Sequence, residues 1–395
     1  MQIDLESLLN LPDVRVTEVQ LSDREAHLFC ASALDCGYCP QCWQPTRVVF
    51  RYHTRVIRDL SLVGRTVFLH LQSRQFHCPR CDRYFNEKFA FVEPSKTLTT
   101  RYEQHVYRMC QSICIIQVCV KEDLTWARVN DIYRRYSTVA VAERDVWRRV
   151  RYLGIDEIAV RKGHKNYACV LVDLERGIVL EFLESRHKAD IIKYFRAKGE
   201  ALCGQIEVVS SDLWEGYSNL AGELFPQAIS VVDRYHFFVH LNRALDKTRQ
   251  EVREAFPDEE KLKHLRWALL KNPKKLRAEE EASLEAAFGL SVELAEVYRL
   301  RQSLKELFDR EMSKQEASAA LSRWELEAEQ SGSKALAKFL GTLRRWRDKV
   351  LNYFPERLTN GVVEGLNNGI RGIIRRAFGF QDFGTLRRRV LVELG

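Results

Sequence analysis

The sequence predicts a multidomain α+β protein whose mixed sheet carries unusually placed acids. Three observations lead to this prediction. Two C-x2-C pairs lie near the N-terminus, β-prone apolar runs interrupted by acids begin at residue 152, and residues 250–345 lose all strand character. The chain has 395 residues, of which 46% are hydrophobic and 29% charged, so it is long enough for several globular domains with cores of their own.

Residues 1–90 predict a zinc ribbon. Two Cys-Pro-x-Cys turns place Cys39 with Cys42 and Cys78 with Cys81, and four thiolates in two such pairs form a tetrahedral Zn2+ site. Cys36 is an alternative first ligand, and buried free cysteines are the simpler interpretation. The odd total of eleven cysteines argues against a disulfide framework. Residues 53–78 alternate apolar and polar side chains, as strands do. The Zn2+ is expected to be structural, because the module is too small for a large core.

Residues 91–150 predict a helix-turn-helix domain. Helical periodicity covers 101–120 and 124–136, and a third helix is expected at 143–151 after a break at 136–142. The third helix would present DNA-binding side chains, since guanidinium groups suit phosphates and base edges. These side chains are Arg144, Trp147, Arg148 and Arg149. A helical connector with a solvated basic face is the alternative.

Residues 151–249 predict the first part of an α/β core. Strands are expected at 152–160, 166–175 and 177–185, then a helix at 187–199, a strand at 205–212, a helix at 215–226, a strand at 227–233 and a helix at 234–252. Three antiparallel strands followed by α-β-α-β form a ribonuclease-H-like order. In that order the first and fourth strands are neighbours, which would bring Asp156 and Asp212 together.

Residues 250–345 predict an all-α insertion, and residues 346–395 return to the catalytic core. A separate helical domain or a dimerising coil remains an alternative for the insertion. Its Trp267 and Trp324 could stack on an unpaired DNA base or lie in the core. Thr359 and Asn360 provide a helix-capping signal. Helical spacing then places five polar side chains on one face: Glu364, Asn367, Asn368, Arg371 and Arg375.

Asp156, Asp212 and Glu364 are the candidate catalytic and metal-binding residues. Two Mg2+ (or Mn2+) ions held by carboxylates support in-line displacement at phosphorus without a protein nucleophile. Solvated surface acids are the simpler interpretation of each acid alone. Asp233 competes with Asp212 for a metal position, and His236 would orient a water or a phosphate. Asn367 and Asn368 would support the site, and Arg371 and Arg375 would bind DNA phosphates.

Composition limits the partners and the location of the protein. The net charge of +8 is mildly basic and favours a polyanionic partner without establishing one. The apolar runs are shorter than the about 18 residues that a membrane span needs. The acidic N-terminus lacks the basic region of a secretory signal. We therefore expect a cytoplasmic protein.

Four segments together resemble the DDE transposases of the insertion-sequence L-three (ISL-three) family: GIDEIAVRKGH, VVSSDLWEGY, VVDRYHFFVHLNRALDKTR and TNGVVEGLNNGIRGIIRRAFGF. The resemblance covers nearly the whole chain. It implies a catalytic triad at Asp156, Asp212 and Glu364, an Asp-x2-His element at Asp233 and His236, and zinc ligands at the four paired cysteines.

The resemblance also implies a Mg2+-dependent DNA strand transferase. Such an enzyme binds the terminal inverted repeats of its mobile element and joins them to target DNA, at the bacterial nucleoid. The reaction pairs two ends, so we expect a homodimer on DNA. A domesticated repressor that no longer cuts and a nuclease without strand transfer are the alternatives.

Overall fold

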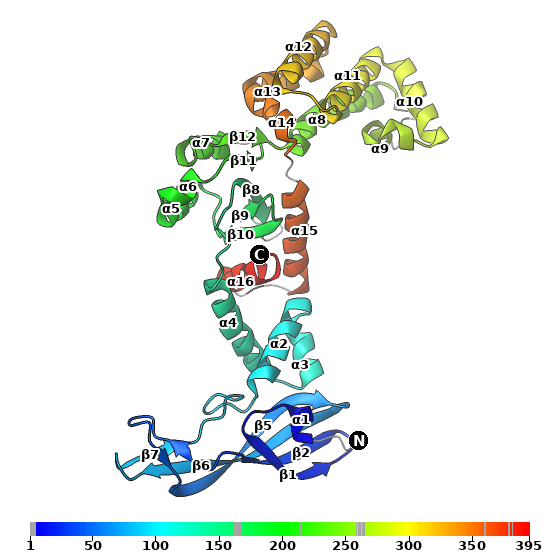
Figure 1. The fold of residues 1–395 in the computed structure, drawn as a ribbon. Helices are drawn as coiled ribbons and strands as arrows, with labels where there is room; N and C mark the ends of the chain where they lie inside the picture. The colour runs from blue at the N-terminus through cyan, green and yellow to red at the C-terminus, as the bar shows by residue number, and fades with distance from the viewer. Residues whose placement is uncertain are drawn as a thin grey trace. The chain divides into compact units, whose positions relative to one another are not determined.

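The computed structural model describes residues 5–160, 167–213, 215–257, 259, 262, 265–358, 361–377, 380 and 382–395. The chain forms two compact units, Met1–Glu143 and Arg144–Gly395 (Figure 1). Among the described residues, no helix is long and apolar enough to cross a membrane. The capping signal expected at Thr359 and Asn360 lies outside the described residues.

A five-stranded sheet forms the first part of unit 1. Its strands follow the order β1-β2-β6-β5, with β7 paired to β6. The bounds are α1 Leu5–Leu9, β1 Val14–Leu21, β2 Glu25–Ser32, β3 Gly37–Tyr38, β4 Pro45–Thr46, β5 Val49–Leu62, β6 Arg65–Cys78 and β7 Arg83–Asn86. The predicted alternation is found in the long β5–β6 hairpin. Strands β1 and β2 were not predicted. They add apolar side chains to the module, whose core includes Leu28, Ile57 and Leu69.

Three helices complete unit 1: α2 Thr100–Ser112, α3 Ile115–Glu122 and α4 Trp126–Ala142. They share a core that includes Val106, Val118 and Ile132. The predicted break at 136–142 is wrong, because α4 continues through it. Ser137 is buried, and its hydroxyl and that of Thr138 both donate to the carbonyl of Arg134 within the helix. Packing therefore outweighs the weak helix propensity of this stretch.

The predicted third helix at 143–151 is also wrong, because this segment is a series of turns in unit 2. Trp147 is only 9% exposed and packs edge-on against Phe195 at 5.6 Å between ring centroids. Arg144 donates to the carbonyl of Val179 at 2.7 Å. Trp147 is thus a core residue and not a DNA contact, whereas Arg148 and Arg149 remain exposed.

A second five-stranded sheet forms the centre of unit 2, in the order β10-β9-β8-β11-β12. Strand β8 pairs antiparallel with β9 and parallel with β11, and β12 is parallel to β11. The predicted neighbourhood of the first and fourth strands is therefore confirmed. The strand bounds are β8 Tyr152–Ala159, β9 Tyr167–Asp173, β10 Ile178–Leu183, β11 Val208–Ser211 and β12 Ile229–Val232.

Helices cover both faces of this sheet. Apolar side chains of α5 and α7 share a core with Leu153 and Ile155 of β8. On the opposite face α15 runs beside β8, and α16 packs on β10, where Phe383 stacks on Phe182 (Figure 1). The helix bounds are α5 Lys188–Lys198, α6 Glu200–Gly204, α7 Glu215–Leu224, α15 Gly361–Arg376 and α16 Phe383–Glu393.

The predicted helical stretch is built from α8 to α14. Its core is continuous with Val231 and Val232 of β12, and it already includes α8, which begins before residue 250. Trp324 is buried and donates to the carbonyl of Leu300, whereas Trp267 is 69% exposed. The bounds are α8 Arg234–Ala255, α9 Leu265–Leu270, the 3-10 helix Pro273–Lys275, α10 Ala278–Leu290, α11 Val292–Asp309, α12 Lys314–Gln330, α13 Lys334–Leu351 and α14 Tyr353–Glu356.

The burial of Trp147 gives a first test. Trp147→Ala should lower the free energy of unfolding by about 3–5 kcal/mol, because it leaves a cavity beside Phe195. Chemical denaturation followed by circular dichroism measures this change. Trp267→Ala is the matched control and should change stability by less than about 0.5 kcal/mol. Equal stabilities of the two variants would contradict a core role for Trp147.

Candidate functional site

Three acids lie level with one another on three adjacent parallel strands: Asp156 inside β8, Asp212 directly after β11 and Asp233 directly after β12. Ser211 pairs with Ile155, so Asp212 leaves β11 level with Asp156 of β8. Val232 pairs with Ser211, so Asp233 leaves β12 level with Asp212. Because parallel strands end at the same edge of a sheet, their registers bring these carboxylates together.

Helix α15 joins this edge because β8 has a glycine beneath it. A Cβ atom at Gly154 would lie 2.9 Å from Cγ2 of Val363 and 2.8 Å from Cδ2 of Leu174, so only glycine permits this close packing. One turn beyond Val363, Asn367 is 3% exposed and donates from Nδ2 to Oδ2 of Asp156 at 2.8 Å. This contact fixes the helix that carries Glu364.

These residues line one cavity of about 690 Å³. The predicted residues that line it are Asp156, Asp212, Asp233, His236, Glu364, Asn367 and Arg371. Asn368 lies beside it and accepts a hydrogen bond from Arg371 at 2.8 Å, and Arg375 is exposed further along α15. The cavity thus brings together acids from within β8, from the ends of β11 and β12, and from the first turn of α15.

The carboxyl of Asp156 lies in a buried environment. Burial raises the pKa of its carboxyl above the usual value, and Asp233 raises it further. The backbone N–H of Glu157, His236 and the amide of Asn367 stabilise the ionised form and oppose this rise. A cation in the cavity would relieve the cost of keeping the buried carboxylate ionised.

Asp233 and His236 form a local pair. Asp233 is the N-cap of α8, and its side chain accepts a hydrogen bond from the backbone N–H of His236. Its Oδ2 also lies 2.9 Å from Nδ1 of His236 and raises the pKa of that imidazole, an effect that burial opposes. Asp233 is therefore engaged in starting α8 and orienting His236.

The cavity also contains cations that the sequence analysis missed. Arg301 and Lys305 reach it from α11, and Arg234 reaches it from α8. Arg301 shares the buried face of α11 with Val297 and Leu304, at helical spacing. The signal in the sequence was a cation at a position where the helical pattern expects an apolar residue, because a buried charge is costly unless it is paired and hydrogen-bonded.

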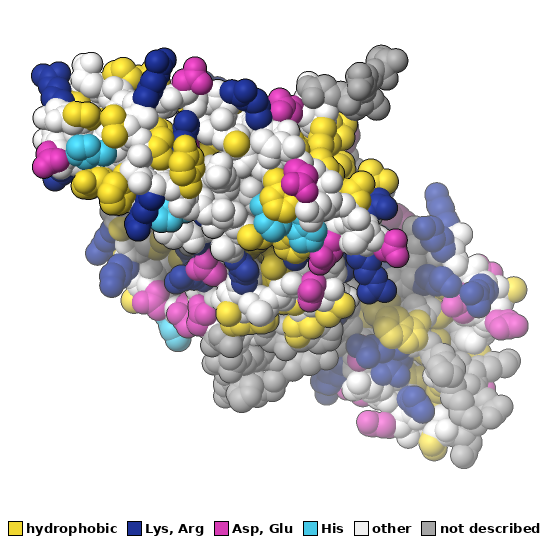
Figure 2. Space-filling model, turned by 90° about the horizontal axis from the view of Figure 1, so that it is seen from below, with side chains coloured by type: hydrophobic (Ala, Val, Ile, Leu, Met, Phe, Trp, Pro, Cys, Tyr) yellow, Lys and Arg dark blue, Asp and Glu magenta, His cyan; other side chains and the backbone are white. Residues whose placement is uncertain are grey.

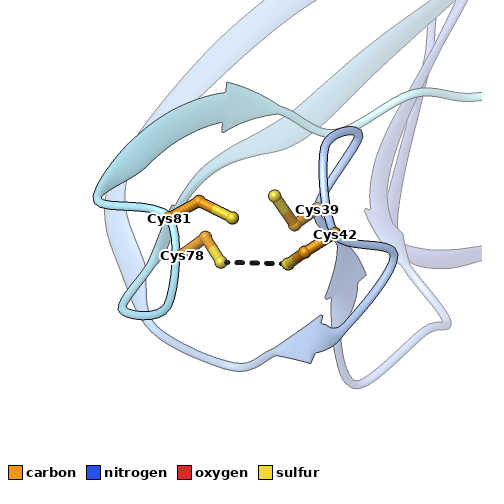
Figure 3. A group of neighbouring side chains, drawn as sticks. All are labelled: Cys39, Cys42, Cys78 and Cys81. Atoms are coloured by element: carbon orange, nitrogen blue, oxygen red, sulfur yellow. Dashed lines mark hydrogen bonds between the residues drawn. The ribbon is translucent and has the colours of Figure 1, made fainter.

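The four predicted cysteines of unit 1 converge as expected (Figure 3). Their sulfur atoms all lie within 4.8 Å of one another, and those of Cys42 and Cys78 are 3.8 Å apart. A tetrahedral Zn2+ with Zn–S bonds of about 2.3 Å requires sulfur atoms about 3.8 Å apart, so the set fits this ion. Cys36 is not part of the cluster.

Electrostatics also favour a cation among these sulfurs. Backbone N–H groups of Cys42 and Gln41 lower the pKa of the Cys39 thiol to about 7. A hydrogen bond with Cys42, followed by burial and a hydrogen bond with Cys39, raises the pKa of the Cys81 thiol to about 12. A cation among the four sulfurs would stabilise their thiolate forms.

Comparisons with known proteins agree with this architecture. A family model described as a transposase, of the DDE class, matches residues 153–390. A second, described as the zinc finger of transposases IS204/IS1001/IS1096/IS1165, matches residues 37–81. The chain thus falls in the class of DDE transposases.

Two curated relatives define the group more closely. The transposase for insertion sequence element IS1001 of Bordetella parapertussis is 30% identical over 349 residues, which cover 87% of this chain and 85% of that protein. The transposase for IS1557 of Mycobacterium tuberculosis is 27% identical over 290 residues, 67% of this chain and 65% of that protein. The chain belongs to the ISL-three family of DDE transposases.

The close approach at Gly154 gives a second test. Gly154→Ala should lower the free energy of unfolding by about 1–3 kcal/mol, because the added methyl group overlaps Val363 and Leu174. Thermal or chemical unfolding measures this change. Gly222→Ala in α7 is the control, since its Cβ meets nothing within 4 Å, and it should leave the stability equal or higher. Similar effects of both substitutions would refute the packing constraint.

The thiolate cluster gives a third test. Cys39→Ser should abolish bound zinc and lower the melting temperature, because three sulfurs bind Zn2+ more weakly than four. Elemental analysis and thermal unfolding report the two effects. Cys36→Ser, three residues earlier, should retain both zinc and stability. Loss of zinc only in the Cys36 variant would reassign the ligand set.

Proposed function

We propose that the chain cleaves the ends of its mobile element and joins them to target DNA at the acidic cavity of unit 2. The observation that carries the proposal is the convergence of Asp156, Asp212 and Glu364 on one cavity. The strand order and the parallel pairing of β8 with β11 support a ribonuclease-H-like core. The family membership supports DNA as the substrate.

The donor set fits a hard divalent cation. It consists of carboxylate oxygens, and Oδ1 of Asn367 is buried without a hydrogen-bond partner among the described residues. Asp156, Asp212 and Glu364 would hold two Mg2+ or Mn2+ ions, which supply an activated water or 3′-hydroxyl and stabilise the leaving oxygen. Asp156 would be the central acid of this set, because β8 pairs with β11 and also packs against α15.

The protein's own side chains position this site. Asn367 orients the Asp156 carboxylate through its hydrogen bond, and Asp233 orients His236. His236 lines the cavity, where it would hold a water or phosphate oxygen. We assign Asp233 to this orienting role and Asp212 to metal binding, since Asp233 already caps α8.

Unit 1 is proposed to bind the terminal repeats. Helix α3, the turn at 123–125 and α4 form a helix-turn-helix candidate that replaces the one expected further along the chain. The start of α4 exposes Trp126 and Arg128. The face shown in Figure 2 has basic side chains mixed with acidic and hydrophobic ones, without one continuous basic patch.

Unit 2 would contribute further phosphate contacts. Arg148 and Arg149 are exposed beside the core, and Arg371 and Arg375 are exposed along α15. A homodimer on DNA is proposed from the pairing of two ends in the reaction.

A cleavage assay tests the proposal. Wild-type protein with Mg2+ or Mn2+ should nick a labelled duplex copied from the DNA that flanks the gene, and it should join the new 3′ ends to a target plasmid. Asp156→Ala should lower both rates by at least about a thousandfold, because the site loses its central carboxylate. Glu184→Ala, an exposed acid after β10, is the control and should behave as wild type.

The same assay separates the alternatives. Sequence-specific binding without nicking by wild-type protein would indicate a repressor. Nicking without joined products would indicate a nuclease. Cleavage that survives Asp156→Ala would locate the chemistry elsewhere in the chain.

A further inference from the structure

We propose that Arg301 and Lys305 of α11 form a phosphate-binding site in the wall of the acidic cavity, through which the helical insertion holds the DNA backbone. The inference rests on the proposed function and deepens it, because it assigns part of the substrate contact to the insertion. Both side chains line the cavity, one helical turn apart.

Arg301 is a buried cation that has no counter-ion among the residues the structure describes. It is 5% exposed, its Nε donates to Oδ1 of Asn242 at 3.1 Å, and its Nη2 donates to the carbonyl of Leu270 at 3.3 Å. Both acceptors are neutral. Within the described ranges, its Nη1 has no hydrogen-bond partner and no carboxylate forms an ion pair with the guanidinium. The cost of burying such a charge is recovered only when an anion meets it.

Tying helices together does not explain a charge at this position. Arg301 does link α8, α9 and α11 through its two hydrogen bonds. A leucine or methionine would continue the apolar face of α11 without the desolvation cost. A guanidinium is favoured when its remaining N–H groups have a planar anion such as a phosphate to bind.

Lys305 adds a second cation on the same face of α11, four residues after Arg301. It is half-buried, lines the cavity, and forms no ion pair with any residue that the structure describes. Arg234, the third cation that the insertion sends to the cavity, pairs with Asp309 at 2.5 Å. Arg371 of α15 donates to the neutral Asn368 at 2.8 Å and is exposed, as a further phosphate contact would be. Within the insertion, Arg301 and Lys305 are therefore the lining cations without a carboxylate partner among the described residues.

A cavity with both carboxylates and unengaged cations suits a phosphodiester. The acids would hold the metal ions that the proposed reaction needs. Arg301 and Lys305 would instead attract the anionic oxygens of the same or an adjacent phosphate. They act as binding and positioning residues, and proton transfer is not required of them.

The test measures DNA binding as a function of salt in the absence of divalent metal. The variants are Lys305→Met and Arg301→Lys, and the matched controls are Lys334→Met on α13 and Arg299→Met, an exposed cation of α11. The probe is the fluorescent duplex from the flanking DNA. Lys305→Met should weaken binding about tenfold at low salt and reduce the slope of log K against log salt by about one. The controls should leave both unchanged.

A second measurement locates the phosphate. Single neutral methylphosphonates are placed along the duplex, one position at a time. A position that contacts the pair should weaken binding by wild-type protein about tenfold and have no further effect on Lys305→Met. Arg301→Lys should shift or weaken this response while it keeps the charge, because lysine lacks the planar donor fork.

The outcomes are distinct from those of the cleavage assay. An unchanged salt slope for Lys305→Met, with additive effects at every methylphosphonate, would overturn the inference even if wild-type protein cleaves DNA. An Arg301→Lys variant that loses thermal stability but keeps the wild-type methylphosphonate response would limit Arg301 to a structural role and overturn its part. Failure of wild-type protein to cleave would overturn the proposed function, while the salt slope still decides whether the cations bind phosphate.

Discussion

The candidate site depends on how closely α15 approaches β8. Their contact joins residues 211 positions apart, through the hydrogen bond from Asn367 to Asp156. That approach requires Gly154, because any side chain there would meet Val363 and Leu174. Because successive side chains of a strand point to opposite faces, Gly154 and Asp156 share the face that α15 covers, while Leu153 and Ile155 face the core under α5 and α7. A single strand thus has one face for stability and one for chemistry.

The helical insertion is an integral part of this site. Its first helix, α8, is capped by Asp233, which leaves β12 level with Asp212. The insertion shares a core with β11 and β12, so α11 is held where Arg301 and Lys305 reach the cavity. The helical insertion therefore begins beside one acid of the cavity, Asp233, and ends beside another, Glu364. Its packed core holds the cations of α11 at fixed positions relative to the carboxylates.

Local patterns explain which features the sequence revealed. The strands of unit 2 and the paired cysteines depend on alternation and spacing, which neighbouring residues determine. The helix predicted at 143–151 fails because Trp147 packs against Phe195, a contact between distant residues that outweighs periodicity. Arg301 was missed for a related reason. In sequence it resembles one more cation of a charged helix, and only the neighbours at Val297 and Leu304 show that it occupies a buried face.

The two candidate metal sites differ in a way that keeps their chemistries apart. Unit 1 offers four thiolates in a closed tetrahedral set, which soft or borderline ions such as Zn2+ prefer. Unit 2 offers only oxygen and a histidine that is already paired, in an open cavity of about 690 Å³. Hard ions that retain water, such as Mg2+, suit the second set and bind thiolates poorly. The ligand types therefore fit a structural ion in unit 1, and they are compatible with the exchangeable ion proposed for unit 2. In the proposed function, divalent ions held by these carboxylates would meet the phosphate from one side of the cavity, and Arg301 and Lys305 would bind its anionic oxygens from α11.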